Sequence, residues 1–88
     1  MEKEKIFRTA ISKYGTEAQV WMAIEECAEL MNALAKSVRG RVTKEDIITE
    51  IADVEIMMEQ LAIIFGEDAV REEKERKLER LKERLCLI

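Results

Sequence analysis

Apolar residues recur at steps of three and four through the middle of this chain, which is the pattern of amphipathic helices. One run falls between about residues 16 and 39 and consists of Val20, Ile24, Cys27, Met31, Leu34 and Val38. A second run falls between about residues 43 and 65 and consists of Ile47, Ile51, Val54, Met58, Leu61 and Phe65. Alternating steps of this kind form the packing seams of helical bundles, so both segments are predicted to be long bundle helices.

Two further helices are predicted on either side of this pair. Residues 2 to about 14 form a weakly amphipathic segment, and residues 67 to about 85 form a densely charged segment with a narrow apolar stripe. The second of these is expected to lie at the periphery. Helices are expected to end at glycines, namely Gly15, Gly40 and Gly66. Helix starts are expected at two capping boxes, Thr16 with Gln19 and Thr43 with Asp46.

The composition agrees with a single all-α domain over residues 1–88. The chain is 48% hydrophobic and 39% charged, with no proline and three glycines, which argues against a sheet rich in turns. A domain of this size buries only roughly 60 to 70% of its unfolded surface. Because apolar residues occupy more than one helix face, one copy cannot cover them all, and at least a dimer is expected.

Charge and residue usage exclude several classes of function. The net charge is -4 and no sustained basic block is present, so binding to duplex nucleic acid is not expected. The absence of histidine removes the usual imidazole base and most zinc sites. No apolar run reaches the roughly 18 residues of a membrane span, and no apolar signal core begins the chain. Cys27 and Cys86 are expected to be reduced thiols, and the protein is expected to be soluble and cytoplasmic.

The candidate chemistry lies in two acidic couplets, Glu26 with Glu29 and Glu50 with Asp53. A spacing of three places both carboxylates of a couplet on one helix face, with Cβ atoms about 5 to 6 Å apart. A short connection favours antiparallel neighbours, so the two helices would bring four carboxylates together. Such a cluster is costly unless a cation neutralises it, and a divalent metal is the expected cation. The spacing alone leaves a solvated or ion-paired face open as the alternative.

The surroundings of the couplets favour burial over a solvated face. At about 100° per residue, the second couplet shares a strip with Asp46 and Gln60 that apolar residues border on both sides, namely Ile51, Val54 and Met58, and Ile56 and Ile63. The first couplet shares a strip opposite the main seam, made of Glu25, Glu26, Glu29, Asn32 and Lys36, with Trp21, Ala28, Ala23 and Leu30 on its flanks.

The couplets carry a resemblance to a known family. The segment Ile24-Glu25-Glu26-Cys27-Ala28-Glu29-Leu30, followed by Glu50-Ile51-Ala52-Asp53-Val54, resembles the Glu-Glu-x-x-Glu and Glu-x-x-Asp signature of the MazG-like all-α nucleoside triphosphate pyrophosphohydrolases. The match covers the two central helices. Lys77-Leu78-Glu79-Arg80 resembles the basic segment that often follows in the fourth helix. The resemblance implies a four-helix bundle that forms dimers or tetramers and uses Mg²⁺ to hydrolyse a (deoxy)nucleoside triphosphate to the monophosphate and pyrophosphate.

The resemblance also implies roles for individual residues. Metal ligands would be Glu26, Glu29, Glu50 and Asp53, with Mn²⁺ as a possible substitute for Mg²⁺. Glu29 or Glu25 would accept the proton of the attacking water, and Glu29 is preferred for its place in the couplet. Substrate-binding candidates are Lys77 and Arg80 by the family pattern, Lys36 and Asn32 by their place on the strip, and Trp21 as a stacking platform or a core anchor.

Other interpretations remain open. Many relatives carry a lysine where this chain has Met22, so either rearranged phosphate contacts or a modest activity is expected. Lys77 and Arg80 are also in a segment full of Glu and Lys pairs at helical spacing, which solvate a helix without binding anything. The main alternative function is a non-catalytic helical oligomer that acts as a protein-interaction module. A carboxylate-bridged redox metal site is a third possibility that the lack of histidine disfavours.

Overall fold

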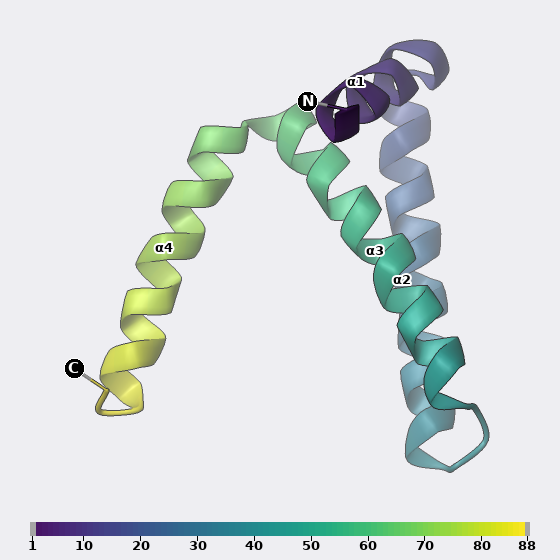
Figure 1. Ribbon diagram of the computed structural model, residues 1–88, viewed down its shortest axis with the longest axis vertical. Coiled ribbons are helices and arrows are strands. Elements are labelled where there is room, and N and C mark those ends of the chain that lie inside the picture. The colour runs from purple at the N-terminus through teal and green to yellow at the C-terminus, as the bar shows by residue number, and fades with distance from the viewer. Residues whose placement is uncertain (1, 88) are drawn as a thin grey trace.

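The computed structural model describes residues 2–87, and nearly all of them are helical (Figure 1). The four helices are α1 (Glu2–Tyr14), α2 (Thr16–Val38), α3 (Lys44–Phe65) and α4 (Glu67–Arg84). No strand occurs within the described residues, so the all-α prediction is confirmed. No described helix combines the length and the apolar character that a membrane crossing requires.

The boundary signals were correct at the start of α3 and wrong at the start of α2. The Thr43 hydroxyl accepts the Asp46 N–H at 3.1 Å, and the Asp46 carboxylate accepts the Thr43 N–H at 3.2 Å, which completes the predicted capping box. Thr16 is instead the first residue of α2, and its N-cap is Gly15, which forms no side-chain cap. Gln19 cannot reach back to cap the helix because its side chain is buried in the contact with α3.

The contact between α2 and α3 is the centre of the fold, and the two helices run side by side in opposite directions (Figure 1). Most of its buried residues are small or polar. Ala23 is 3% exposed, and the Gln19 side-chain amide donates a 2.7 Å hydrogen bond to the Gln60 carbonyl, which is 4% exposed. This bond satisfies the buried amides, which would otherwise carry a desolvation cost. Ala33 and Met57 complete the contact row.

The predicted apolar seams do not form this contact. The contact row of α2 runs through Gln19, Ala23 and Ala33, about 100° around the helix from the seam. The α2 seam is therefore mostly exposed: Met31 is 65% and Ile24 is 50% exposed. The small residues Ala23 and Ala33 on the contact row of α2 allow the two backbones to approach, and Glu26 lies on the same row.

Both seams lie on the same side of the α2–α3 pair. On each helix the seam is rotated by about 100° from the contact row, in the same rotational sense when each helix is viewed from its N-terminus. Because the two helices are antiparallel and their contact rows face each other, these equal rotations place both seams on one side of the pair. We call this surface the apolar face and define it by its exposed members, Ile24, Met31, Leu34, Ile51, Met58 and Phe65. α1 packs across one end of the pair with Phe7 buried, and it leaves the apolar face open.

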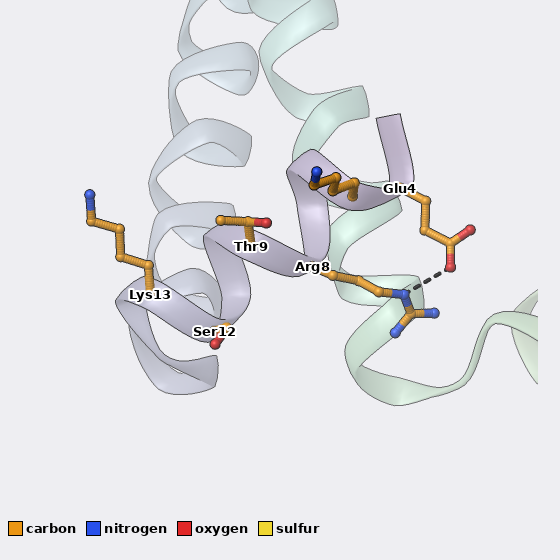
Figure 2. Close-up of a pocket in the computed structure, with 6 residues that line it drawn as sticks. Glu4, Arg8, Thr9, Ser12 and Lys13 are labelled. Carbon is orange, nitrogen blue, oxygen red and sulfur yellow. Dashed lines mark hydrogen bonds and ion pairs between the residues drawn. The ribbon is translucent and has the colours of Figure 1, made fainter. Parts of the chain in front are cut away.

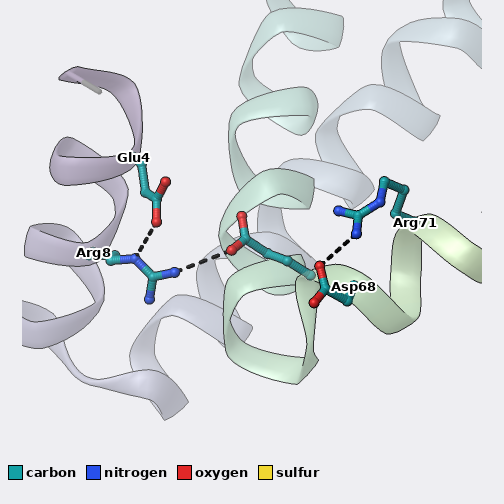
Figure 3. A network of polar contacts seen from close by, with 5 residues as sticks. Glu4, Arg8, Asp68 and Arg71 are labelled. Carbon is teal, nitrogen blue, oxygen red and sulfur yellow. Dashed lines mark hydrogen bonds and ion pairs between the residues drawn. The ribbon is translucent and has the colours of Figure 1, made fainter.

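α4 lies at the periphery, as its narrow stripe predicted. It diverges from α3 at Gly66, whose φ of 125° a residue with a side chain rarely adopts (Figure 1). Its first turn is held by a 3.2 Å bond from the Arg8 guanidinium to Glu67, next to the Arg71–Asp68 pair (Figure 3). No residue of α4, which the structure describes in full, is buried. Within one chain, α4 therefore does not close a four-helix bundle.

Candidate metal centre

Three carboxylates from α2 and α3 converge in the middle of the contact between the helices. Glu26, Glu29 and Glu50 each offer one oxygen atom, and these atoms lie within 4.8 Å of one another. Two oxygens on opposite sides of a Mg²⁺ ion at about 2.1 Å are about 4.2 Å apart. The observed separations are thus close to those of a ligand set, and carboxylate oxygens are the hard ligands that Mg²⁺ prefers.

Two of these carboxylates contain buried oxygen atoms without a partner. Glu26 Oε1 and Glu50 Oε1 are shielded from solvent and accept no hydrogen bond from any described residue. Across residues 2–87, no lysine or arginine forms an ion pair with either group. Burying an ionised carboxylate in this way is expensive. Coordination to a cation would be one way to satisfy unpartnered carboxylate oxygens of this kind.

The electrostatics of Glu26 agree with this geometry. Its pKa lies above the ordinary value of 4.5, mainly because burial penalises the charged form. The negative charges of Glu29, Asp53, Glu50 and Glu25 raise the pKa further, in that order. The other three predicted ligands therefore act on Glu26, although Asp53 does not belong to the closest group of three.

A groove with a cavity volume of about 370 Å³ adjoins the cluster. Glu29 and Glu50 line one part of it, and Asn32 and Lys36 line its continuation along α2. The structure thus places these two predicted substrate-binding residues beside the carboxylates. The sequence interpretation missed Thr49 and Val42, which also line the groove. Thr49 directly precedes Glu50 on α3, whereas Val42 lies in the non-helical connection before α3, which a helical wheel does not place.

Other predicted residues lie away from the cluster. Lys77 and Arg80 are on α4, and Lys77 is 3.7 Å from Glu73 of its own helix. Among the described residues, α4 approaches α3 only near Gly66 and does not contact α2. Trp21 is exposed and does not line the groove. Glu25 is exposed beside the cluster and acts on it only through its charge.

A larger hollow of about 660 Å³ runs along the outer surface of α1 (Figure 2). It is lined from this one helix by residues that include Glu4, Arg8, Thr9, Ser12 and Lys13, and the Arg8 guanidinium donates to Glu4 at 2.8 Å within it. Arg8 and Glu4 pair with each other there, and among the described residues of this surface no buried polar atom lacks a partner, in contrast to the contact between α2 and α3.

Comparison with known proteins adds no relative to this description. The chain matches no protein-family model, no curated protein and no solved structure.

Proposed function

We propose that this protein is a Mg²⁺-dependent nucleoside triphosphate pyrophosphohydrolase of the MazG-like type, which converts a (deoxy)nucleoside triphosphate to the monophosphate and pyrophosphate. One observation supports the proposal above the others. Glu26 Oε1 and Glu50 Oε1 are buried without a partner, in a group whose third member, Glu29, opens onto a groove. A divalent cation and a phosphate chain together would satisfy both features.

The proposed ligands are Glu26, Glu29 and Glu50, and Asp53 is proposed as a fourth ligand because its charge acts on Glu26. Mg²⁺, or Mn²⁺ in its place, would supply charge neutralisation to the phosphates and lower the pKa of the attacking water. The burial of Glu26 and Glu50 keeps their carboxylates in place between two packed helices. Fixed ligands of this kind need no rearrangement when the cation enters.

Glu29 is the proposed proton acceptor. It is exposed, whereas Glu26 and Glu50 are half-buried, and it faces the groove where substrate would lie. In the reaction, a water oxygen bonds to the α-phosphorus, the bond from that phosphorus to the bridging oxygen breaks, and pyrophosphate leaves with that oxygen. The proton from the water passes to Glu29. Glu25, the adjacent exposed carboxylate, is the alternative acceptor.

Substrate contacts are proposed on both sides of the cluster. Lys36 and Asn32 line the groove, where Lys36 would contact phosphate and Asn32 the sugar or base. Trp21, with its exposed ring, is a candidate for stacking on the base. Lys77 and Arg80 lie too far along α4 to act in their own chain, so any contribution from them would come from another copy.

The open apolar face supports assembly of the protein as a homodimer or tetramer. Six large apolar side chains are exposed on one side of two adjoining helices, and exposed surfaces of this kind mark interaction sites. A second copy placed against it would bury both faces and create the closed bundle that a single chain lacks. The two free cysteines and the proposed triphosphate substrate agree with a cytoplasmic location.

Assembly is tested by placing a charge on the apolar face. Met58→Glu at the middle of this face is expected to convert a dimer to monomers, because a buried unpaired carboxylate opposes association. Ile48→Glu is the matched control, since Ile48 is exposed on α3 but does not belong to the apolar face. Sedimentation velocity distinguishes the two. A wild-type protein that remains monomeric at high concentration would contradict the assembly.

The enzymatic proposal is tested by Glu50→Gln, which keeps the size of the side chain and removes its charge. Release of pyrophosphate from a panel of triphosphates with Mg²⁺ is expected to fall about 100-fold, or about 2.7 kcal/mol in transition-state stabilisation. Glu79→Gln on the exposed surface of α4 is expected to leave the rate unchanged. Absence of turnover by the wild type on every triphosphate, or full activity of Glu50→Gln, would refute the proposal.

A non-catalytic interaction module is the second candidate function, and the open apolar face is the observation that favours it. Such a protein would use the face to bind a partner and would retain the carboxylates without a ligand. The two candidates differ in their response to metal, because only a protein with a metal site gains stability from millimolar Mg²⁺ or Mn²⁺.

A further inference from the structure

We propose that the turn between α2 and α3 binds the terminal phosphates of the substrate, through Lys36, Arg39 and Arg41. This inference rests on the proposed function, because it assigns the far end of a phosphate chain whose near end lies at the carboxylate cluster. The substrate would then lie in the groove with the near end of its phosphate chain at the cluster and the far end at the turn. The protein would prefer substrates with two or more phosphates beyond the cluster.

The turn is the part of the chain with the most uniform positive charge. Residues 36–44 contain Lys36, Arg39, Arg41 and Lys44 and no acidic residue. Within residues 2–87, none of these four side chains forms an ion pair. α4 is different, because its basic residues alternate with glutamates and several are paired with them. The cations of the turn therefore remain available to an anionic ligand.

The groove connects this turn to the cluster. Glu29, Asn32 and Lys36 follow one another along a single strip of α2, and Lys36 lies about 10 Å from Glu29 along the helix axis. Val42 lines the same groove from the turn. The Arg41 N–H donates to the Lys36 carbonyl at 2.9 Å, which folds the turn back against the end of α2. The backbones of Arg39 and Arg41 are thus both bonded to Lys36, which lines the groove, and Arg41 directly precedes Val42, which also lines it.

Charge also changes sign along the groove in the way that a metal-bound polyphosphate requires. The carboxylates would act through a cation at one end, and the basic turn would contact phosphate oxygens directly at the other. Arginine suits this role because its guanidinium can form two parallel hydrogen bonds to a phosphate. Asp46 is the groove carboxylate nearest the turn, and it already accepts the Thr43 N–H in the capping box at the positive end of α3.

The test measures binding of pyrophosphate, which represents the terminal phosphates, by calorimetry in the presence of Mn²⁺. The double variant Arg39→Ala/Arg41→Ala is expected to bind pyrophosphate at least about tenfold more weakly than the wild type. Lys36→Ala is expected to show a similar loss. The matched control is Arg71→Ala/Arg84→Ala, which removes the same charge from the exposed surface of α4. The control is expected to retain wild-type affinity.

Thermal melts with and without Mn²⁺ separate this inference from the proposed function. A wild type that gains no stability from Mn²⁺ would overturn both. A normal gain from Mn²⁺ in every variant, with equal affinity for pyrophosphate in the wild type and the turn variants, would overturn the role of the turn alone. An equal loss of affinity in the turn variant and the α4 control would also overturn it, since net charge would then explain the binding.

Discussion

Carboxylates at helical spacing occur both in the α2–α3 pair and in α4, and the two regions treat them in opposite ways. In α4, Glu73 faces solvent and bonds to Arg76 three residues later, and this hydrogen bond lowers its pKa. In α2, Glu26 faces another helix and other carboxylates, and burial raises its pKa. The spacing is the same, but the neighbours differ. Glu73 pairs with Arg76 on its own helix, whereas Glu26 is covered by α3 and meets only other carboxylates on both helices.

The comparison shows what distinguishes a candidate site from a solvated helix surface. α2 presents Ala23 and Ala33 on the same row as Glu26, and these small residues let α3 approach closely enough to cover the carboxylate. α4 presents long charged residues all around its stripe, and no helix of the described chain packs along it. Close packing of α2 against α3 therefore leaves carboxylate oxygens of the cluster without hydrogen-bond partners. The charged side chains of α4, which no helix covers, stay hydrated and several pair with one another.

The sharpest test of this difference is the response of each region to metal. With Mn²⁺ at about 100 times its dissociation constant, the wild type is expected to gain about 2.7 kcal/mol of stability. Glu26→Gln is expected to lose most of this gain, because it removes one of the three converging carboxylates. Glu73→Gln on α4 is expected to retain all of it. Differential scanning calorimetry at fixed pH provides the measurement.

Two results of the metal experiment would break the comparison. Equal stabilisation of the wild type and Glu26→Gln would show that the ion binds outside the cluster. A loss of stabilisation in Glu73→Gln would show that α4 supplies part of the site, for example from another copy of the chain.

Packing provides a second test. Ala33→Leu inserts a large side chain into the buried contact row between α2 and α3, and such overpacking typically costs about 1 to 3 kcal/mol in the free energy of unfolding. Ala69→Leu adds the same atoms to an exposed position of α4, where surface substitutions usually change stability by about 0.5 kcal/mol or less. Urea denaturation compares the two. Similar values for both variants would mean that the α2–α3 contact is loose.

Much of the fold could be predicted because the responsible signals are local. The period of the apolar residues defined four helices, and Thr43 with Asp46 defined the start of α3 through bonds within one turn. The couplets were also visible, because a spacing of three fixes a shared face without any knowledge of the partner helix.

The packing of the helices could not be predicted in the same way, because it depends on which faces meet. Periodicity identified the large apolar seams as packing surfaces without saying what covers them. The structure packs the rows that contain Ala23 and Gln60 and leaves Met31 exposed. Helix propensity contains no information on the direction of α4 after Gly66, so the separation of Lys77 from the cluster was not foreseeable either.

The smallest expected effect is a difference in how stability depends on pH without metal. The pKa of Glu26 is raised in the folded state, so the folded protein holds this proton more tightly than the unfolded chain does. Stability is therefore expected to fall as pH rises from about the ordinary value of 4.5 through the raised pKa, and to show no further loss from this group above it. The lowered pKa of Glu73 has the opposite sign, since its contribution is lost as pH falls below 4.5.

Urea midpoints measured in EDTA between about pH 4 and pH 8 separate these contributions. Glu26→Gln is expected to flatten the decline above pH 4.5, because the amide cannot ionise, and to be more stable than the wild type at neutral pH without metal. Glu73→Gln is expected to leave that decline intact. The prediction would be contradicted if the stability of the wild type rose through this range and Glu26→Gln followed the same curve. The cluster would then be open to water, and α2 and α4 would differ in sequence but not in the burial of their carboxylates.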